Sequence, residues 1–246
     1  VTGHAMYDSQ SGTFKIRKGP VFTNLLLVDE INRASPRTQS AFLEAMAEGN
    51  VTIDRKTAGL PKPFMVIATQ NPIEFAGTFA LPEAQLDRFL LHVQVGYPNA
   101  EQERSILVLN RNEAKANTRD AFQPPELLSV ASVMQARQEI LRLHLAEELE
   151  EYIVNIVLAT RNAGSVDDSL DGQILYGASP RASIGIDRAA RARAWLEGRD
   201  FVGPEDIQDV AADVLRHRLV LSFEAEADGV DANSVIERIL DGVGVP

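Results

Sequence analysis

The chain has 246 residues, 24 Lys+Arg against 35 Asp+Glu for a net charge of −11, no Cys and 45% hydrophobic residues. This length suits one large domain or two smaller ones with a real core, and the lack of Cys excludes disulfide frameworks, thiol nucleophiles and Cys-based metal sites. The acidic balance disfavours broad binding to nucleic acid or anionic membranes, so we expect protein partners and no nucleic acid.

The sequence offers no candidate for a membrane span or a secretion signal. No stretch approaches the roughly 18 apolar residues that a spanning helix needs. The opening residues, VTGHAMYDSQSG, have neither the basic nor the apolar region of a signal peptide. We therefore expect a cytoplasmic protein without a membrane span. Because the first residue is Val1 rather than Met, we also expect a processed product or a piece of a longer polypeptide.

Short apolar runs before Pro98 predict the strands of an α/β sheet. After a turn over residues 8–12, the alternation over 13–17 predicts a hairpin strand. A helix is predicted from about Pro36 to Glu48, with Ser35 as N-cap and Gly49 as its stop. The runs that predict sheet strands are residues 25–28, 51–53, 64–68 and 89–95.

The pattern becomes helical after Pro98, which divides the chain into two predicted domains, 1–98 and 99–246. In the second domain, apolar residues recur at helical spacing over 149–157 and 207–215. The coarse fold is therefore an α/β segment followed by an all-α domain.

The string LLLVDEINR places two acids directly after an apolar run. A buried strand with this pattern presents Asp29 and Glu30 at the carboxyl edge of a parallel sheet, where α/β proteins bind ligands. One acid can then hold Mg²⁺ while the next polarises a water for attack on a phosphate. The string alone fits equally well a plain strand end followed by a solvated turn.

Three further strings place polar side chains where they could act on a phosphate. Asn71 of ATQNP follows a predicted strand, and its amide can orient a water there, although an ordinary Asn-Pro turn is the alternative. Arg88 of LPEAQLDRF can stabilise phosphoryl charge in a neighbouring subunit, or simply pair with Asp87 on the surface. Arg181 of GASPRAS lies in the first turn of a helix, where a cation opposes the helix dipole unless an anion is nearby.

Taken in order, the strings over residues 25–53, 60–98 and 177–207 resemble the MoxR family of AAA+ ATPases, because they agree with it in identity, order and spacing. The resemblance covers nearly the whole chain. It implies the parallel sheet core of a P-loop NTPase, present in part, followed by an all-helical AAA+ lid. It also implies that the hairpin at the start is the helix-2 insert of this clade, and that residues 51–60 form its pre-sensor hairpin.

The resemblance assigns a role to each candidate residue. Asp29 and Glu30 would form the Walker B pair, with Asp29 serving Mg²⁺ and Glu30 activating water. Asn71 would be sensor 1. Arg88 would be the arginine finger acting on a neighbouring subunit, and Arg181 would be sensor 2, reaching the γ-phosphate from the lid.

The family implies an ATPase that uses ATP and Mg²⁺ in a homo-oligomeric ring, typically a hexamer. Hydrolysis would drive chaperone-like remodelling or maturation of client proteins, such as metalloenzymes or proteins that receive a cofactor. A von Willebrand factor A domain protein is a common partner. A nucleic-acid motor would use the same core, but the net charge of −11 disfavours it.

The chain departs from the family pattern at the phosphate-binding loop. That loop needs G-x-x-x-x-G-K-[ST], and none of the 16 Gly residues is followed by Lys. We therefore expect a MoxR protein that lacks its N-terminal part and is inactive alone. The alternative function is a truncated, non-hydrolysing interaction module that pairs with its relatives.

Overall fold

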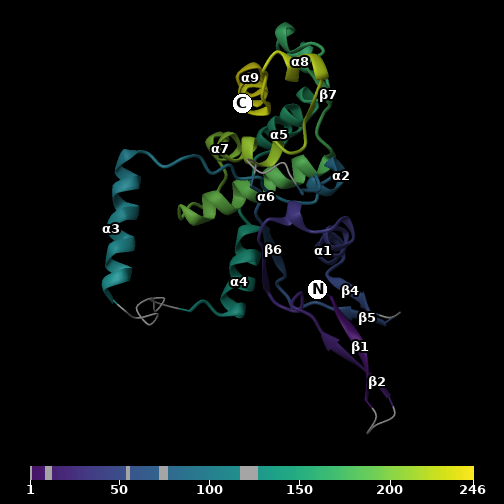
Figure 1. The fold of residues 1–246 in the computed structure, drawn as a ribbon. Helices are drawn as coiled ribbons and strands as arrows, with labels where there is room; N and C mark the ends of the chain where they lie inside the picture. The colour runs from purple at the N-terminus through teal and green to yellow at the C-terminus, as the bar shows by residue number, and fades with distance from the viewer. Residues whose placement is uncertain (1, 9–12, 54–55, 72–76, 117–126) are drawn as a thin grey trace. The chain divides into compact units, whose positions relative to one another are not determined.

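The computed structural model describes residues 2–8, 13–53, 56–71, 77–116 and 127–246 (Figure 1). The described residues divide into two units. One unit comprises the chain up to His92 together with Ile140–Pro246, and the other is Val93–Glu139.

Two antiparallel hairpins belong to the α/β part of the first unit. Strand β1 (Gly3–Asp8) pairs with β2 (Thr13–Lys18), which confirms the hairpin predicted at the start of the chain. Its predicted turn lies mostly outside the described residues. Strand β4 (Asn50–Ile53) pairs with β5 (Lys56–Gly59) and forms the second hairpin.

A parallel pair of strands carries the predicted acids. Strand β3 (Leu25–Val28) runs parallel to β6 (Met65–Ala68), with Leu25 opposite Met65 and Val28 opposite Ala68. Both strands were predicted from their apolar runs, and β6 begins one residue later than expected. Because the pair is parallel and in register, both carboxyl ends lie at the same edge.

Helix α1 (Pro36–Glu48) has the predicted bounds. The Ser35 hydroxyl accepts a hydrogen bond from the Thr38 backbone N–H at 3.4 Å, and Gly49 ends the helix at φ 63°, in the left-handed region that favours glycine. The buried apolar residues of this part form one core. They are Val21, Leu26, Val28, Ile31, Phe42, Leu43, Ala45, Val51, Ile53, Leu60 and Leu81.

The strand predicted over residues 89–95 is wrong. After the short helix α2 (Glu83–Leu86), residues 89–95 form neither strand nor helix. In the first part of this segment, backbone groups are bonded to the helical part instead of to a strand: the carbonyls of Phe89 and Leu90 accept from Arg218, and the His92 N–H donates to the Asp213 carbonyl at 2.8 Å. A backbone that is satisfied by side chains and a helix end leaves little for a neighbouring strand to pair with.

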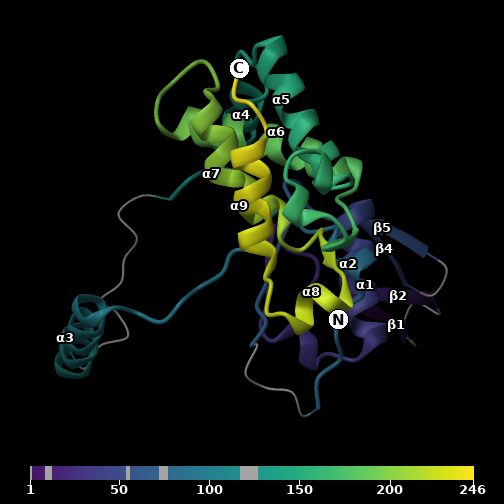
Figure 2. The ribbon, with the colours of Figure 1, turned by 90° about the horizontal axis from the view of Figure 1, so that it is seen from above.

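The helical part of the first unit contains the larger core. Figures 1 and 2 both show α5 (Glu147–Ala159), α6 (Pro180–Leu196), α7 (Pro204–Leu215) and α9 (Ala232–Gly242) gathered together. The predicted apolar face of α5 is buried throughout, and in α7 only Val210 is partly exposed. Shorter elements connect these helices: η2 (Ala163–Ser165), η3 (Asp168–Leu170), β7 (Ile174–Tyr176), β8 (Val220–Leu221) and α8 (Phe223–Ala227).

The second unit holds α3 (Ala100–Ala116) and all but the last residue of α4 (Val130–Ile140). No helix among the described residues is long and apolar enough to cross a membrane. The domain boundary predicted at Pro98 stays a prediction.

Candidate functional site

The ends of β3 and β6 are tied together by one hydroxyl group. Asp29 and Glu30 follow β3 directly, and Thr69 follows β6. The Thr69 hydroxyl donates to Asp29 Oδ1 at 2.6 Å and accepts from the Glu30 backbone N–H at 2.9 Å. The sequence-predicted acids therefore lie at a strand edge whose local geometry is fixed by hydrogen bonds.

Glu30 has an unusual backbone conformation. Its φ of 50° and ψ of 54° are left-handed, and it is the only non-glycine with positive φ among the described residues. Such strain costs about 1–3 kcal/mol and clusters at functional sites. The Ile31 N–H donates to the Thr69 carbonyl at 3.0 Å, so Thr69 supports the strained turn from both sides. The 3-10 helix η1 (Ile31–Arg33) follows at once.

The Glu30 carboxylate is partly exposed and has a weak partner. Arg33 Nε lies 3.1 Å from Glu30 Oε2, and half of the Arg33 side chain is exposed. Solvent-exposed ion pairs of this kind contribute only about 0–1 kcal/mol. Glu30 can therefore leave Arg33 at little cost to contact a water or another group.

The donors at this edge suit Mg²⁺ better than softer metals. Carboxylate and hydroxyl oxygens are hard ligands, and Mg²⁺ is usually bound through one or two carboxylates, waters and substrate phosphates. Within the described residues, no three His, Cys, Asp or Glu side chains are grouped closely enough to hold a metal by themselves. Asp29 therefore fits Mg²⁺ that arrives with a phosphate ligand, rather than a closed protein site.

Asn71 lies two residues beyond Thr69 at the same edge and is partly exposed. The residues that follow, 72–76, are outside the described part of the chain. The structure thus places Asn71 where the sequence predicted it, after the neighbouring strand, and its role stays a prediction.

The two predicted arginines belong to a second group of residues, around Asp87. Arg181 Nη1 lies 3.2 Å from Asp87 Oδ2, and about half of the Arg181 side chain is exposed. The Ser179 hydroxyl, which caps α6, is 3.0 and 3.1 Å from the two Asp87 carboxylate oxygens. Arg218 Nε lies 3.0 Å from Asp87 Oδ1. The sequence offered a surface pair of Asp87 with Arg88 as an alternative. In the structure Asp87 instead binds Ser179, Arg181 and Arg218 of the helical part.

Arg88 is exposed and points to α1, where its Nη1 donates to the Leu43 carbonyl at 3.2 Å. The hydrogen bonds of Arg88 and Arg181 thus involve other residues than those that join Asp29, Glu30 and Thr69. The structure brings Thr69 to the two acids, whereas Arg88 contacts α1 and Arg181 contacts Asp87.

The sequence did not point to Gln39, a residue that supports the turn after Glu30. Gln39 is buried within α1, and its Nε2 donates to the carbonyls of Ile31 and Phe79, each at 3.1 Å. It supports the turn after Glu30. A lone amide on the apolar face of an amphipathic helix was the available signal.

His217 was regarded as an ordinary residue, but it is buried between the two parts of the first unit. Its Nε2 is 3.1 Å from the Phe89 carbonyl, and its ring meets that of His92 edge to face at 5.8 Å. Burial lowers the pKa of His217 to about 4, and the charge of Arg218 acts in the same direction. The string RHR directly after the apolar helix α7 was the signal in the sequence.

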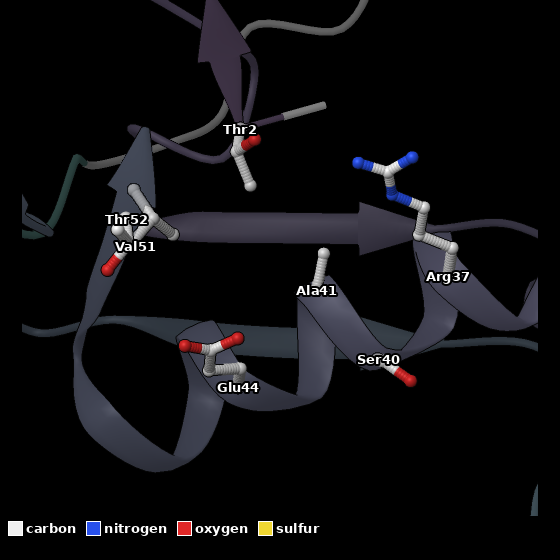
Figure 3. A pocket seen from close by; sticks show the side chains of 7 residues that line it. All are labelled: Thr2, Arg37, Ser40, Ala41, Glu44, Val51 and Thr52. Carbon is white, nitrogen blue, oxygen red and sulfur yellow. The ribbon is translucent and has the colours of Figure 1, made fainter. Parts of the chain in front are cut away.

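A hollow of about 520 Å³ lies beside α1, away from these groups. Its lining residues are Arg37, Ser40, Ala41 and Glu44 of α1, Val51 and Thr52 of β4, and Thr2. Figure 3 shows Thr2 above α1 and the Ser40 hydroxyl pointing away from β4. None of the predicted site residues lines it. Asp29 and Glu30, the acids that could bind a metal ion or activate water, do not line this hollow. We therefore place the candidate site at the ends of β3 and β6.

Comparison with known proteins places the chain in a class. Residues 1–91 match a model of the ATPase family associated with various cellular activities (AAA), and residues 170–239 match the AAA lid domain. A solved structure of a "putative ATPase" from Cytophaga hutchinsonii superposes with a TM-score of 0.89 at 42% identity, over 99% of this chain and 73% of that one. The fold is therefore the predicted AAA+ α/β core followed by a helical lid.

Relatives named MoxR narrow the class of AAA+ ATPases to one family. The chain is 42% identical over its whole length to uncharacterized protein YeaC of Bacillus subtilis, covering 73% of it. It is also 42% identical over its whole length to chaperone MoxR1 of Mycobacterium tuberculosis, covering 64% of it. To protein MoxR of Paracoccus denitrificans it is 32% identical, over 89% of this chain and 68% of that protein. The chain belongs to the MoxR family of AAA+ ATPases. It spans between 64% and 73% of the length of these relatives.

Proposed function

We propose that these residues belong to an Mg²⁺-dependent ATPase whose hydrolytic site is the edge formed by the ends of β3 and β6. The observation that carries this proposal is the pair of adjacent acids, Asp29 and Glu30, held at the strand ends by Thr69. Parallel α/β sheets bind their ligands at this edge. Membership of an AAA+ family gives the ligand class, a nucleoside triphosphate.

The division of labour follows from charge and position. Asp29 would hold Mg²⁺, which supplies charge neutralisation to the phosphates when it is bound. Glu30 would accept a proton from the attacking water, and the neutral amide of Asn71 would orient that water without adding charge. Phosphoryl transfer gains mostly from positioning and charge stabilisation, which these groups can provide.

The two arginines would stabilise the charge that develops on the γ-phosphate. Arg181 is free to move because its exposed pair with Asp87 is weak, while Ser179 and Arg218 keep hold of that carboxylate. Arg88 is exposed and would act on ATP bound to a neighbouring copy, as an arginine finger supplied in trans.

The phosphate-binding loop has no counterpart in these 246 residues, because no Gly is followed by Lys. ATP binding as proposed therefore requires backbone N–H groups and a Lys from outside this sequence. Hydrolysis by the protein in its full natural length is the relevant activity.

Shared sites imply an assembly. We infer a homo-oligomeric ring, with six copies as the expected number, in which ATP lies between subunits and its hydrolysis remodels client proteins in the cytoplasm. Chaperone MoxR1 is the relative whose name supports a chaperone role. A von Willebrand factor A domain protein is the expected partner.

The substitution Glu30→Gln in the full-length protein tests this function. An amide of the same size cannot accept the proton of water, so we expect turnover of Mg·ATP to fall at least 10³-fold, an order of magnitude set by the loss of general base and electrostatic assistance. Binding of Mg·ATP should stay close to wild type, as measured by calorimetry.

The matched control is Glu224→Gln, which makes the same change at an exposed position on α8. It should hydrolyse ATP like the wild type. Normal turnover by Glu30→Gln would contradict the proposed role of this strand edge.

A further inference from the structure

A buried arginine, Arg218, holds the segment that carries Arg88, and its contact with the Asp87 carboxylate is only part of what it does there. Arg218 lies just after α7, and only 3% of its side chain is exposed. A guanidinium has five N–H donors in a rigid planar fork. In Arg218 each of these donors has an acceptor.

Four of the five hydrogen bonds of Arg218 go to residues 87–90. Its Nε donates to Asp87 Oδ1 at 3.0 Å, and its Nη2 donates to the carbonyls of Asp87 at 3.2 Å and Phe89 at 2.5 Å. Its Nη1 donates to the Leu90 carbonyl at 3.2 Å and to the Val214 carbonyl of α7. One side chain thus joins the end of α7 to the residues on both sides of Arg88.

The two preceding residues extend the same attachment. His217 Nε2 lies 3.1 Å from the Phe89 carbonyl, and Arg216 Nη1 donates to the His92 carbonyl. The His92 N–H in turn donates to Asp213 of α7. Residues 87–92 are therefore bound along their length to the end of one lid helix, and Arg218 makes most of these bonds.

The hydrogen bonds of Arg218 hold the backbone on both sides of Arg88. Asp87 and Phe89, its two neighbours, are both held by Arg218, whereas the Arg88 side chain itself is exposed and makes one hydrogen bond to the Leu43 carbonyl. A catalytic group misplaced by about 1 Å can lose roughly 10²-fold in rate. The residue that follows the end of α7 by a few positions thus holds both backbone neighbours of Arg88.

We propose that Arg218 is the positioning residue for Arg88, coupling the lid to the arginine that each subunit offers to its neighbour. This role rests on the proposed function, since it needs Arg88 to act in trans. The hydrogen bonds of Arg218 go to residues 87, 89, 90 and 214, and none of them goes to Asp29 or Glu30. It acts through the backbone of residues 87–90.

The substitution Arg218→Lys in the full-length protein tests the role. Lys keeps the charge but has three donors and no planar fork, so it cannot hold all of these acceptors. We expect kcat to fall about 10²-fold. The KM for ATP should change little, because the subunit's own binding groups are intact. Arg191→Lys is the matched control: Arg191 is 15% exposed and bonds Asp187 and the Leu143 carbonyl, away from this segment.

Mixed assemblies separate positioning from general structural damage. Subunits with Glu30→Gln have an inactive acid but a correctly held Arg88. Subunits with Arg218→Lys have intact acids but an Arg88 that is no longer held in place. A Glu30→Gln neighbour would offer a well-placed Arg88 to an Arg218→Lys pocket. We therefore expect a mixture of the two variants to recover turnover, which damage within the Arg218→Lys pocket itself would not allow.

Mixing Glu30→Gln with Arg88→Ala provides the reference for the proposed function. If this reference recovers turnover while the Arg218→Lys mixture does not, or if Arg218→Lys alone is as active as wild type, the positioning role is overturned and the function stands. If the reference fails, Arg88 does not act in trans and both proposals fall. Should Arg218→Lys not assemble, Arg216→Lys loosens the same segment at His92 and is judged by the same mixture.

Discussion

At the scale of single residues, Thr69 shows how much of the site depends on a side chain that performs no chemistry. Its hydroxyl orients the Asp29 carboxylate and accepts from the Glu30 N–H, while its carbonyl accepts from Ile31. The sequence predicted the two acids at a strand end. It gave no sign of the left-handed backbone at Glu30, because that conformation is rare for this residue type and arises from bonds to a distant strand.

Removing the Thr69 hydroxyl should impair the site without unfolding it. In Thr69→Val the Asp29 carboxylate loses a short hydrogen bond, and the Glu30 N–H loses its acceptor. Groups that orient metal ligands typically contribute about 10–100-fold to metal affinity or activity. We expect the Mg²⁺ concentration for half-maximal ATP turnover to rise by this factor in the full-length protein.

Thr69→Ser keeps the hydroxyl and should restore nearly normal Mg²⁺ dependence. Equal Mg²⁺ dependence in the Val and Ser variants would show that the hydroxyl does not organise the acids.

At the scale of elements, the sequence predicted those helices and strands whose ends are set by neighbouring residues. Helix α1 has the predicted bounds because Ser35, Pro36 and Gly49 set its ends. The segment over 89–95 was predicted as a strand from its apolar, branched residues, yet its carbonyls bind side chains that lie more than a hundred residues later. Such long-range partners cannot be read from a local pattern.

The contact between the end of α7 and residues 87–92 should make stability depend on pH. In the unfolded chain His217 takes up a proton near 6.5, whereas in the folded chain burial holds its pKa at about 4. Between these values the unfolded state binds more protons, so the free energy of unfolding falls as pH falls from about 6.5 to 4, by up to about 1.4 kcal/mol per pH unit. Burial and the charge of Arg216 lower the pKa of His92 in the same direction.

Denaturant unfolding at pH 7 and pH 5 measures this dependence. His217→Gln removes the titrating ring and should give a smaller drop in unfolding free energy between the two pH values than the wild type. An equal drop in both proteins would show that His217 is not protonated on unfolding in this range.

At the scale of the whole molecule, the order of strings in the sequence was enough to predict the AAA+ core and the lid, and the comparisons confirm both. The sequence did not indicate how the lid is attached to the core. Arg218 lies far from Asp87 along the chain, and a basic residue after a helix is ordinary in isolation. Attachment depends on complementary groups from distant segments, which only the folded chain brings together.

The central claim is that ATP is hydrolysed at a site completed by acids from one subunit and Arg88 from the next. Turnover of Mg·ATP by an equal mixture of full-length Glu30→Gln and Arg88→Ala tests it most directly. Each variant alone should be inactive, and mixed rings should recover roughly a quarter of wild-type turnover if pockets act independently in a cyclic assembly. A mixture that forms rings and stays inactive would contradict the shared site.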